Sequence, residues 1–412
     1  MYHIDRAGNR ALTPGLLRPR VRVSPNVWCL GATSLFTDIS SEMVASVLPA
    51  YLILGLGFTP FALGAVDGLY QGVGAAVRWV SGAAADRWRR HKEIALVGYL
   101  VSAVCKIGLL VVSGWTAIAT VIAVDRVGKG IRTAPRDALV SLSSEASALG
   151  SAFGVHRTLD AAGALIGPLA AFAVLMMTPH AFDNVFIISF SAALVGLGVL
   201  VLFVENVGIP IDGAKHERPD FIAAPAPKNR RFLYLMVGAS ALTLATVSDA
   251  FVYLQIQRSS RFVAAAFPLM AFGTAGTYML LAAPAGRLAD RVGTGRMFLI
   301  GHVVLFPMYA LLWIAAPGVS VALVCVLLLG AYYALTDGVL AAKASSMLGP
   351  AVRATGLAVL GTAVSACRFI ASVTFGGIWT AWGPRTAIAG FSAALVVALP
   401  VAAFAFTTRR TP

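Results

Sequence analysis

The chain contains twelve long apolar runs separated by polar connections, and this pattern limits the possible folds more than any other feature. The runs cover residues 27–52, 61–83, 94–113, 116–137, 149–178, 184–205, 232–256, 264–285, 296–316, 319–346, 351–379 and 386–407. A helix needs about 20 apolar residues to cross the hydrocarbon core of a bilayer. Only 12% of the 412 residues are charged, whereas a soluble domain has about 25%. The sequence therefore predicts an all-α membrane protein with twelve transmembrane helices.

Basic residues indicate which side of the membrane each loop faces. The N-terminal segment and the connections after even-numbered runs hold most of the 32 lysines and arginines, whereas the opposite loops hold Arg258, Arg261 and Arg385. Cytoplasmic loops are enriched in these residues. We therefore expect a multi-pass protein of the plasma (inner) membrane with both termini in the cytoplasm. This bias accounts for the net charge of +14, so nucleic-acid binding is not expected.

The longest connection, 206–231, divides the chain near its midpoint. It contains Pro210, Pro219, Pro225 and Pro227 together with charges of both signs. It is predicted to be a cytoplasmic linker between an N-terminal six-helix bundle, 27–205, and a C-terminal one, 232–408. Residues 1–26 and 409–412 are predicted to be cytoplasmic tails.

A repeated loop supports this division. The connections after runs two and eight share the pattern G-xxx-D-R, followed by further basic residues. Glycine permits close helix approach, and aspartate accepts hydrogen bonds from a helix N-terminus or an arginine. The repeat is thus predicted to latch helices together, although a solvated turn remains the alternative. Its residues are Gly82, Asp86, Arg87 and Arg90 in the first copy, and Gly286, Asp290 and Arg291 in the second.

These loops resemble the signatures of the major facilitator superfamily. The segment from Arg126 to Gly130 is similar to its R-xxx-G element, and Gly163, Gly167 and Pro168 resemble the G-xxx-G-P signature of its drug/metabolite:proton antiporter branch. The resemblance covers essentially residues 25–408. It implies two six-helix bundles with pseudo-twofold symmetry, in which helices 1, 4, 7 and 10 line a central cavity. The Gly163–Gly167 stretch is expected to pack closely against a neighbour and to bend at Pro168.

Ionisable residues within the apolar runs are the candidate functional groups. Each costs about 2.5–3.5 kcal/mol at the centre of a membrane helix, so these residues are expected to pair or to line water. They are Asp38, Glu42, Asp67, Asp125, Asp160, Asp249, Asp337, Arg78, Lys106, Arg126, Lys129, Arg157 and Arg368. The runs that correspond to cavity helices carry Asp38, Glu42, Asp125, Arg126, Lys129, Asp249 and Asp337.

Their spacing predicts specific roles. Asp38 and Glu42 share one helix face, and two close carboxylates resist double ionisation, so the pair is a candidate proton carrier. Ion pairing with another helix is the alternative. Arg157 and Asp160 are predicted either to form a static pair or to act in gating or proton relay. Arg126 and Lys129 share a positive face, which favours an anionic or zwitterionic substrate.

The chain lacks the phosphate-binding pattern G-xxxx-GK[ST], HExxH and G-x-S-x-G, and its four cysteines lie singly. No enzymatic activity, metal site or cofactor is therefore expected, and a proton gradient is the predicted energy source. The predicted function is proton-coupled efflux of a small organic solute by alternating access. Two alternatives remain, namely proton-symport uptake of a nutrient or metal chelate, and a receptor-like member without transport. The expected partners are the solute, protons and the lipid bilayer.

Overall fold

The computed structural model describes residues 23–74, 77, 81, 84–85, 90–145, 148–207, 230–260, 262–314, 318–349 and 352–407, and every regular element in these ranges is a helix. The N-terminal half contains α1 (Pro25–Ala50), the π-helix η1 (Tyr51–Gly55), α2 (Pro60–Gly72), α4 (His91–Val111), α5 (Trp115–Leu142), α6 (Leu149–Met177) and α7 (Phe182–Phe203). The C-terminal half contains α8 (Arg230–Leu244), α9 (Asp249–Ser260), the 3₁₀ helix η2 (Ala264–Ala266), α10 (Phe267–Val292), α11 (Thr294–Val303), α12 (Leu305–Ile314), α13 (Val319–Met347), α14 (Arg353–Trp382) and α15 (Pro384–Thr407).

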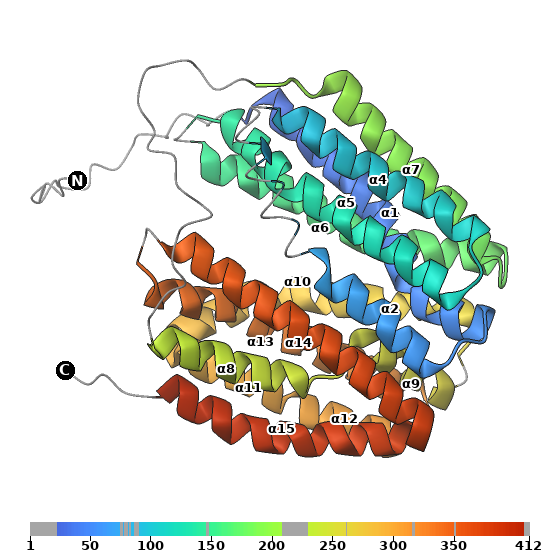
Figure 1. Cartoon of the computed structure of the whole chain (residues 1–412), viewed down its shortest axis with the longest axis vertical. Coiled ribbons are helices and arrows are strands. Elements are labelled where there is room, and N and C mark those ends of the chain that lie inside the picture. The colour runs from blue at the N-terminus through green and yellow to red at the C-terminus, as the bar shows by residue number, and fades with distance from the viewer. Residues whose placement is uncertain are drawn as a thin grey trace, which may run out of the picture.

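The two halves form two helical bundles that lie side by side (Figure 1). Among the described residues, ten helical stretches are long and apolar enough to cross a membrane. The predicted run 116–137 lies in the helix α5, which carries six charged residues. In run 61–83, α2 ends at Gly72, and the described residues 74, 77 and 81 beyond it are also helical. The all-helical membrane fold is thus confirmed. The tail 409–412 and most of the tail 1–26 and of the linker 206–231 lie outside the described residues.

The seventh predicted run, 232–256, is not one continuous helix, which corrects the sequence-based expectation. Helix α8 ends at Leu244, and α9 begins at Asp249. At the break, the backbone N–H of Val247 donates a 2.8 Å hydrogen bond to the Tyr309 hydroxyl of α12. A buried break needs such a side chain, because unpaired backbone groups are costly within a membrane. The break places Asp249 at the N-terminus of a helix.

Exposed apolar side chains form the surface that faces the lipid. On α4 they are Val97, Leu100, Val104, Ile107 and Val111, each at least 40% exposed. Their spacing of three and four residues puts them in one stripe along the helix. In water such a stripe would be unfavourable, whereas in a bilayer it is solvated by acyl chains. The stripe therefore identifies the outer face of α4.

We call one end of the molecule the terminal end, because the start of α1 and the end of α15 lie there. Asn26 there donates a 2.7 Å hydrogen bond to Ser143 Oγ and accepts a 2.8 Å bond from the backbone N–H of Glu205. These bonds join the start of α1 to the ends of α5 and α7. In the C-terminal half, Gly238 of α8 packs against Ala402 and Ala405 of α15.

The two halves contact each other at the opposite end of the molecule, which we call the far end. Helix α2 packs along α14 there, and the backbone N–H of Phe61 donates a 2.9 Å hydrogen bond to Thr380 Oγ1. A Cβ at Gly68 would lie 2.8 Å from Phe369 Cδ2, so only glycine fits this contact. Helix α6 also packs against η2 and α10. Figure 1 shows α2 beside α14 and the halves diverging toward the terminal end.

Candidate functional site: a central acidic cavity

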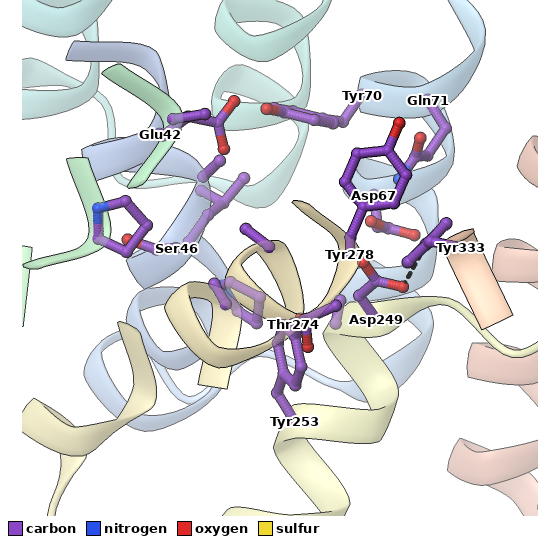
Figure 2. A pocket seen from close by; sticks show the side chains of 18 of the residues that line it. Glu42, Ser46, Asp67, Tyr70, Gln71, Asp249, Tyr253, Thr274, Tyr278 and Tyr333 are labelled. Carbon is purple, nitrogen blue, oxygen red and sulfur yellow. Dashed lines mark hydrogen bonds between the residues drawn. The ribbon is translucent and has the colours of Figure 1, made fainter. Parts of the chain in front are cut away.

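A cavity of about 460 Å³ lies between the two halves. It is lined by α1, α2 and α6 from one half and by α9, α10 and α13 from the other. Its volume is within the range of small-molecule sites, which is about 300–1,000 Å³. Four carboxylates line it, namely Glu42, Asp67, Asp249 and Asp337, together with Tyr70, Tyr253, Tyr278 and Tyr333. Figure 2 shows Asp67 and Asp249 near each other and Glu42 on the opposite side.

Three of the four cavity carboxylates have identifiable partners. Ser372 of α14 donates a 2.7 Å hydrogen bond to Asp67, and the Tyr333 hydroxyl donates one of 2.5 Å to Asp249. Asp337 lies 3.5 Å from the Arg368 guanidinium in a partly exposed ion pair. Asp249 is the first residue of α9, so its carboxylate lies at the positive end of the helix dipole. Glu42 has no ion pair within 4 Å among the described residues.

A separate charge core joins α4 to α5, beside the cavity. Asp125 pairs with Lys106 through one oxygen and with Arg126 through the other. All three side chains are at most 6% exposed. The Arg126 guanidinium carbon lies 3.9 Å from the centre of the Tyr70 ring, so this tyrosine separates it from the cavity. Arg126 is therefore held between a carboxylate and an aromatic ring.

A second buried network links α5 to α1 and α6. Arg132 lies 3.8 Å from the carboxylate of Asp38, and Arg136 lies 3.4 Å from that of Asp160. Arg136 also donates a 3.2 Å hydrogen bond to Ser34 Oγ, which lies 3.0 Å from Nε2 of the buried His156. Each buried charge needs several polar or charged partners, because moving a charged side chain out of water is costly.

Glycines on α6 determine how close this network comes to α1. A Cβ at Gly163 would lie 3.1 Å from the Asp38 Cβ, and one at Gly167 would lie 2.8 Å from the Glu42 Cβ. These positions leave no room for a side chain, as expected where small residues permit helix contact. The stretch that ends at Pro168 thus packs against the helix face that carries both candidate proton carriers. The α-helix continues through Pro168 to Met177.

The remaining sequence-predicted residues are placed as follows. Arg157 is exposed and forms no ion pair within 4 Å with a described residue; Asp160 instead pairs with Arg136. Lys129 lies on α5 outside the cavity lining. In the second loop copy, Asp290 and Arg291 are exposed at the end of α10, and Gly286 is not crowded by a neighbour. In the first copy, Arg90 is exposed, whereas Gly82, Asp86 and Arg87 lie outside the described residues.

Sequence reasoning underestimated three groups. Arg132 and Arg136 were not counted among the candidate functional groups, but they are buried within α5. One signal could have found them. Arg132 and Arg136 follow Lys129 by three and seven residues, so all three lie on the same face of a helix. Asp67 was counted as ionisable without a role, although it lines the cavity. Within the described residues, no group of three His, Cys, Asp or Glu side chains is arranged to hold a metal ion.

Comparison with known proteins identifies the family. The family model described as Major Facilitator Superfamily matches residues 30–372. The chain belongs to the major facilitator superfamily. A relative from Methanocaldococcus jannaschii, named as an uncharacterized MFS-type transporter, is 29% identical over 92% of this chain and 94% of its own length. An uncharacterized protein of Mycobacterium tuberculosis is 35% identical over 41% of each chain.

Solved structures of transporters share the fold. The nucleoside transporter NupG has a TM-score of 0.75 at 15% identity, covering 93% of this chain and 100% of its own. A bacterial homolog of the human lysosomal transporter Spinster, in an inward-facing and unoccupied conformation, has a TM-score of 0.70 at 15% identity, covering 94% and 98%. The protein is thus a multi-pass membrane transporter of the MFS type.

Proposed function

We propose that this protein exports a small organic solute across the plasma membrane in exchange for protons, by alternating access. One observation carries the proposal. A solute-sized cavity lies between the two halves, and it is lined by carboxylates from both of them. A site shared between two rocking bundles is exposed to either side in turn. Carboxylates in it can take up and release protons during that cycle.

The contacts between the halves support a specific state of the cycle. The halves touch along α2 and α14 at the far end. If the terminal end is cytoplasmic, as the basic residues predict, the structure corresponds to an inward-open state. The loop that contains Asp290 and Arg291 and its sequence counterpart in the N-terminal half are each predicted to latch neighbouring helices when the terminal end closes. These loops are the proposed latch of the opposite state.

Glu42 and Asp38 are the proposed proton carriers. Glu42 lines the cavity, and Asp38 lies one turn away, beside Arg132. Gly163 and Gly167 hold α6 against both positions, so a change in helix packing alters both environments together. Protonation of Asp38 weakens its attraction to Arg132, which links proton uptake to the contact between α1 and α5.

Reconstituted vesicles test this proposal. A solute that stabilises the purified protein in a thermal screen is labelled, and its accumulation in the vesicles is measured. A pH-sensitive dye reports the accompanying proton movement. We expect Glu42→Gln and Asp38→Asn to lose gradient-driven accumulation but to retain solute counterflow, because binding does not need the carried proton. Asp183→Asn, at the start of α7, is the matched control. Normal accumulation by both variants would refute the coupling, and proton movement in the same direction as the solute would indicate symport.

A further inference from the structure

The charges that line the cavity are all of one sign. Its lining includes Glu42, Asp67, Asp249 and Asp337, and no lysine or arginine. The chain as a whole carries a net charge of +14, so this acidic lining runs against the overall composition. A cavity lined by one sign of charge concentrates ions of the opposite sign.

The basic residues near the cavity are engaged elsewhere or lie behind it. Arg368 pairs with Asp337, and Arg126 is held by Asp125 beneath the Tyr70 ring. Lys129 lies near Glu42 and Asp38 on α5, outside the lining. Among the described residues, neither Asp67 nor Asp249 forms an ion pair within 4 Å. Both accept hydrogen bonds from hydroxyl groups. Arg368 lines a small pocket beside them, but its ion pair is with Asp337.

Aromatic rings complete the site. Four tyrosines line the cavity, and the face of an aromatic ring attracts cations. Figure 2 shows Tyr278 and Tyr333 next to Asp67 and Asp249. Thr274 also lines the cavity and is 5% exposed.

We propose that the cavity binds an organic cation, with its positive charge held between Asp67 of α2 and Asp249 of α9 and its apolar part against the tyrosines. This inference rests on the proposed transport function and specifies its substrate class. It replaces the anionic or zwitterionic solute that the spacing of Arg126 and Lys129 favoured. Because the two carboxylates belong to different halves, a cation bound to both also holds the halves together.

A matched set of ligands tests the charge of the substrate. The probes are phenyltrimethylammonium, its neutral isostere tert-butylbenzene and the anion benzenesulfonate, with tetraphenylphosphonium and phenylguanidine as further cations. Their binding to the purified full-length protein is measured by titration calorimetry in detergent. We expect at least one cation to bind, and the neutral and anionic probes not to bind measurably. Binding of the anion, or of no cation, would overturn the proposal.

Substitutions locate the bound charge. Asp67→Asn and Asp249→Asn keep side-chain size and remove the charge, and each is expected to weaken cation binding by about tenfold. Asp249→Glu should retain most of the affinity, and Asp183→Asn should retain all of it. Cation affinity that is unchanged in the Asp67→Asn/Asp249→Asn double variant would contradict the assignment. A thermal unfolding curve for each variant verifies that it is folded.

Flux measurements separate this inference from the proposed function. Cation binding without any counterflow in vesicles would refute transport while leaving the binding site intact. Counterflow of a neutral or anionic solute, combined with no cation binding, would refute the substrate class while leaving transport intact.

Discussion

Ser372 donates a 2.7 Å hydrogen bond to the carboxylate of Asp67, and this bond joins the two halves of the protein at the edge of the cavity. Asp67 lies on α2 and Ser372 on α14, the two helices that pack together at the far end. The bond must break if the halves separate there. It therefore connects the state of a cavity carboxylate to the closure of the far end.

Ser372→Ala is expected to favour opening of the far end. Loss of one hydrogen bond to a buried carboxylate costs about 1–2 kcal/mol, which is roughly a five- to thirtyfold shift toward the open form. The measurement is the labelling rate of a cysteine at Gln71, a cavity residue, by a thiol reagent added from the far side. The background lacks Cys29, Cys105, Cys325 and Cys367. Ser392→Ala, whose hydroxyl bonds within its own helix, is the control. Equal labelling rates would show that this bond does not contribute to closure.

Gly68→Val is expected to prevent closure of the far end. A Cβ at this position would lie 2.8 Å from Phe369 Cδ2 and 3.1 Å from the Phe369 carbonyl oxygen, so α2 and α14 must move apart. Such overpacking costs about 1–3 kcal/mol. Vesicle transport should be strongly reduced, and far-side labelling of Gln71→Cys should rise. Gly198→Ala, which meets no neighbouring atom, should have no effect. Partial recovery on adding Phe369→Ala would confirm the cause, and normal transport by Gly68→Val alone would contradict it.

Lys106→Met is expected to destabilise the N-terminal half. Asp125 would lose one of its two charged partners while it remains buried. Breaking a buried ion pair in this way costs about 3–5 kcal/mol. The measurement is the midpoint of thermal unfolding in detergent, which should fall by several degrees. Arg157→Met changes an exposed side chain and should have little effect. Unfolding of Lys106→Met at the wild-type temperature would mean that the charge core is not required for stability.

Cation binding is expected to weaken as the pH falls. A proton on Asp67 or Asp249 removes the negative charge that holds the cation, so affinity is highest where both are ionised. Tyr333→Phe removes the 2.5 Å hydrogen bond that stabilises ionised Asp249, so affinity should be lost at a higher pH than in the wild type. Titration calorimetry across a pH series checks both effects. Affinity that does not vary with pH would indicate that neither carboxylate contacts the charge.

Local sequence signals predicted the parts of the protein that depend on local chemistry. The run that contains Gly163 and Gly167 was predicted to pack closely against a neighbour, and it does so along α1. The break between Leu244 and Asp249 was missed, because its backbone partner Tyr309 lies far away in the chain. The burial of Arg132 and Arg136 was missed for a related reason. Asp38 and Asp160, with which they pair across helices, are far away in the chain, so these contacts are not visible from the residues around the arginines.

The sequence by itself determined that this chain crosses a membrane repeatedly as helices, because long apolar runs leave a backbone in lipid no other way to satisfy its hydrogen bonds. It also determined which charges required partners. Only the tertiary structure decided how those charges are divided. Lys106 and Arg126 pair with Asp125. Asp67 and Asp249 meet across the two halves, and among the described residues neither forms an ion pair, because the nearby Arg368 pairs with Asp337. Which charges become neighbours depends on helix packing over hundreds of residues, and this division makes the cavity acidic in a basic protein.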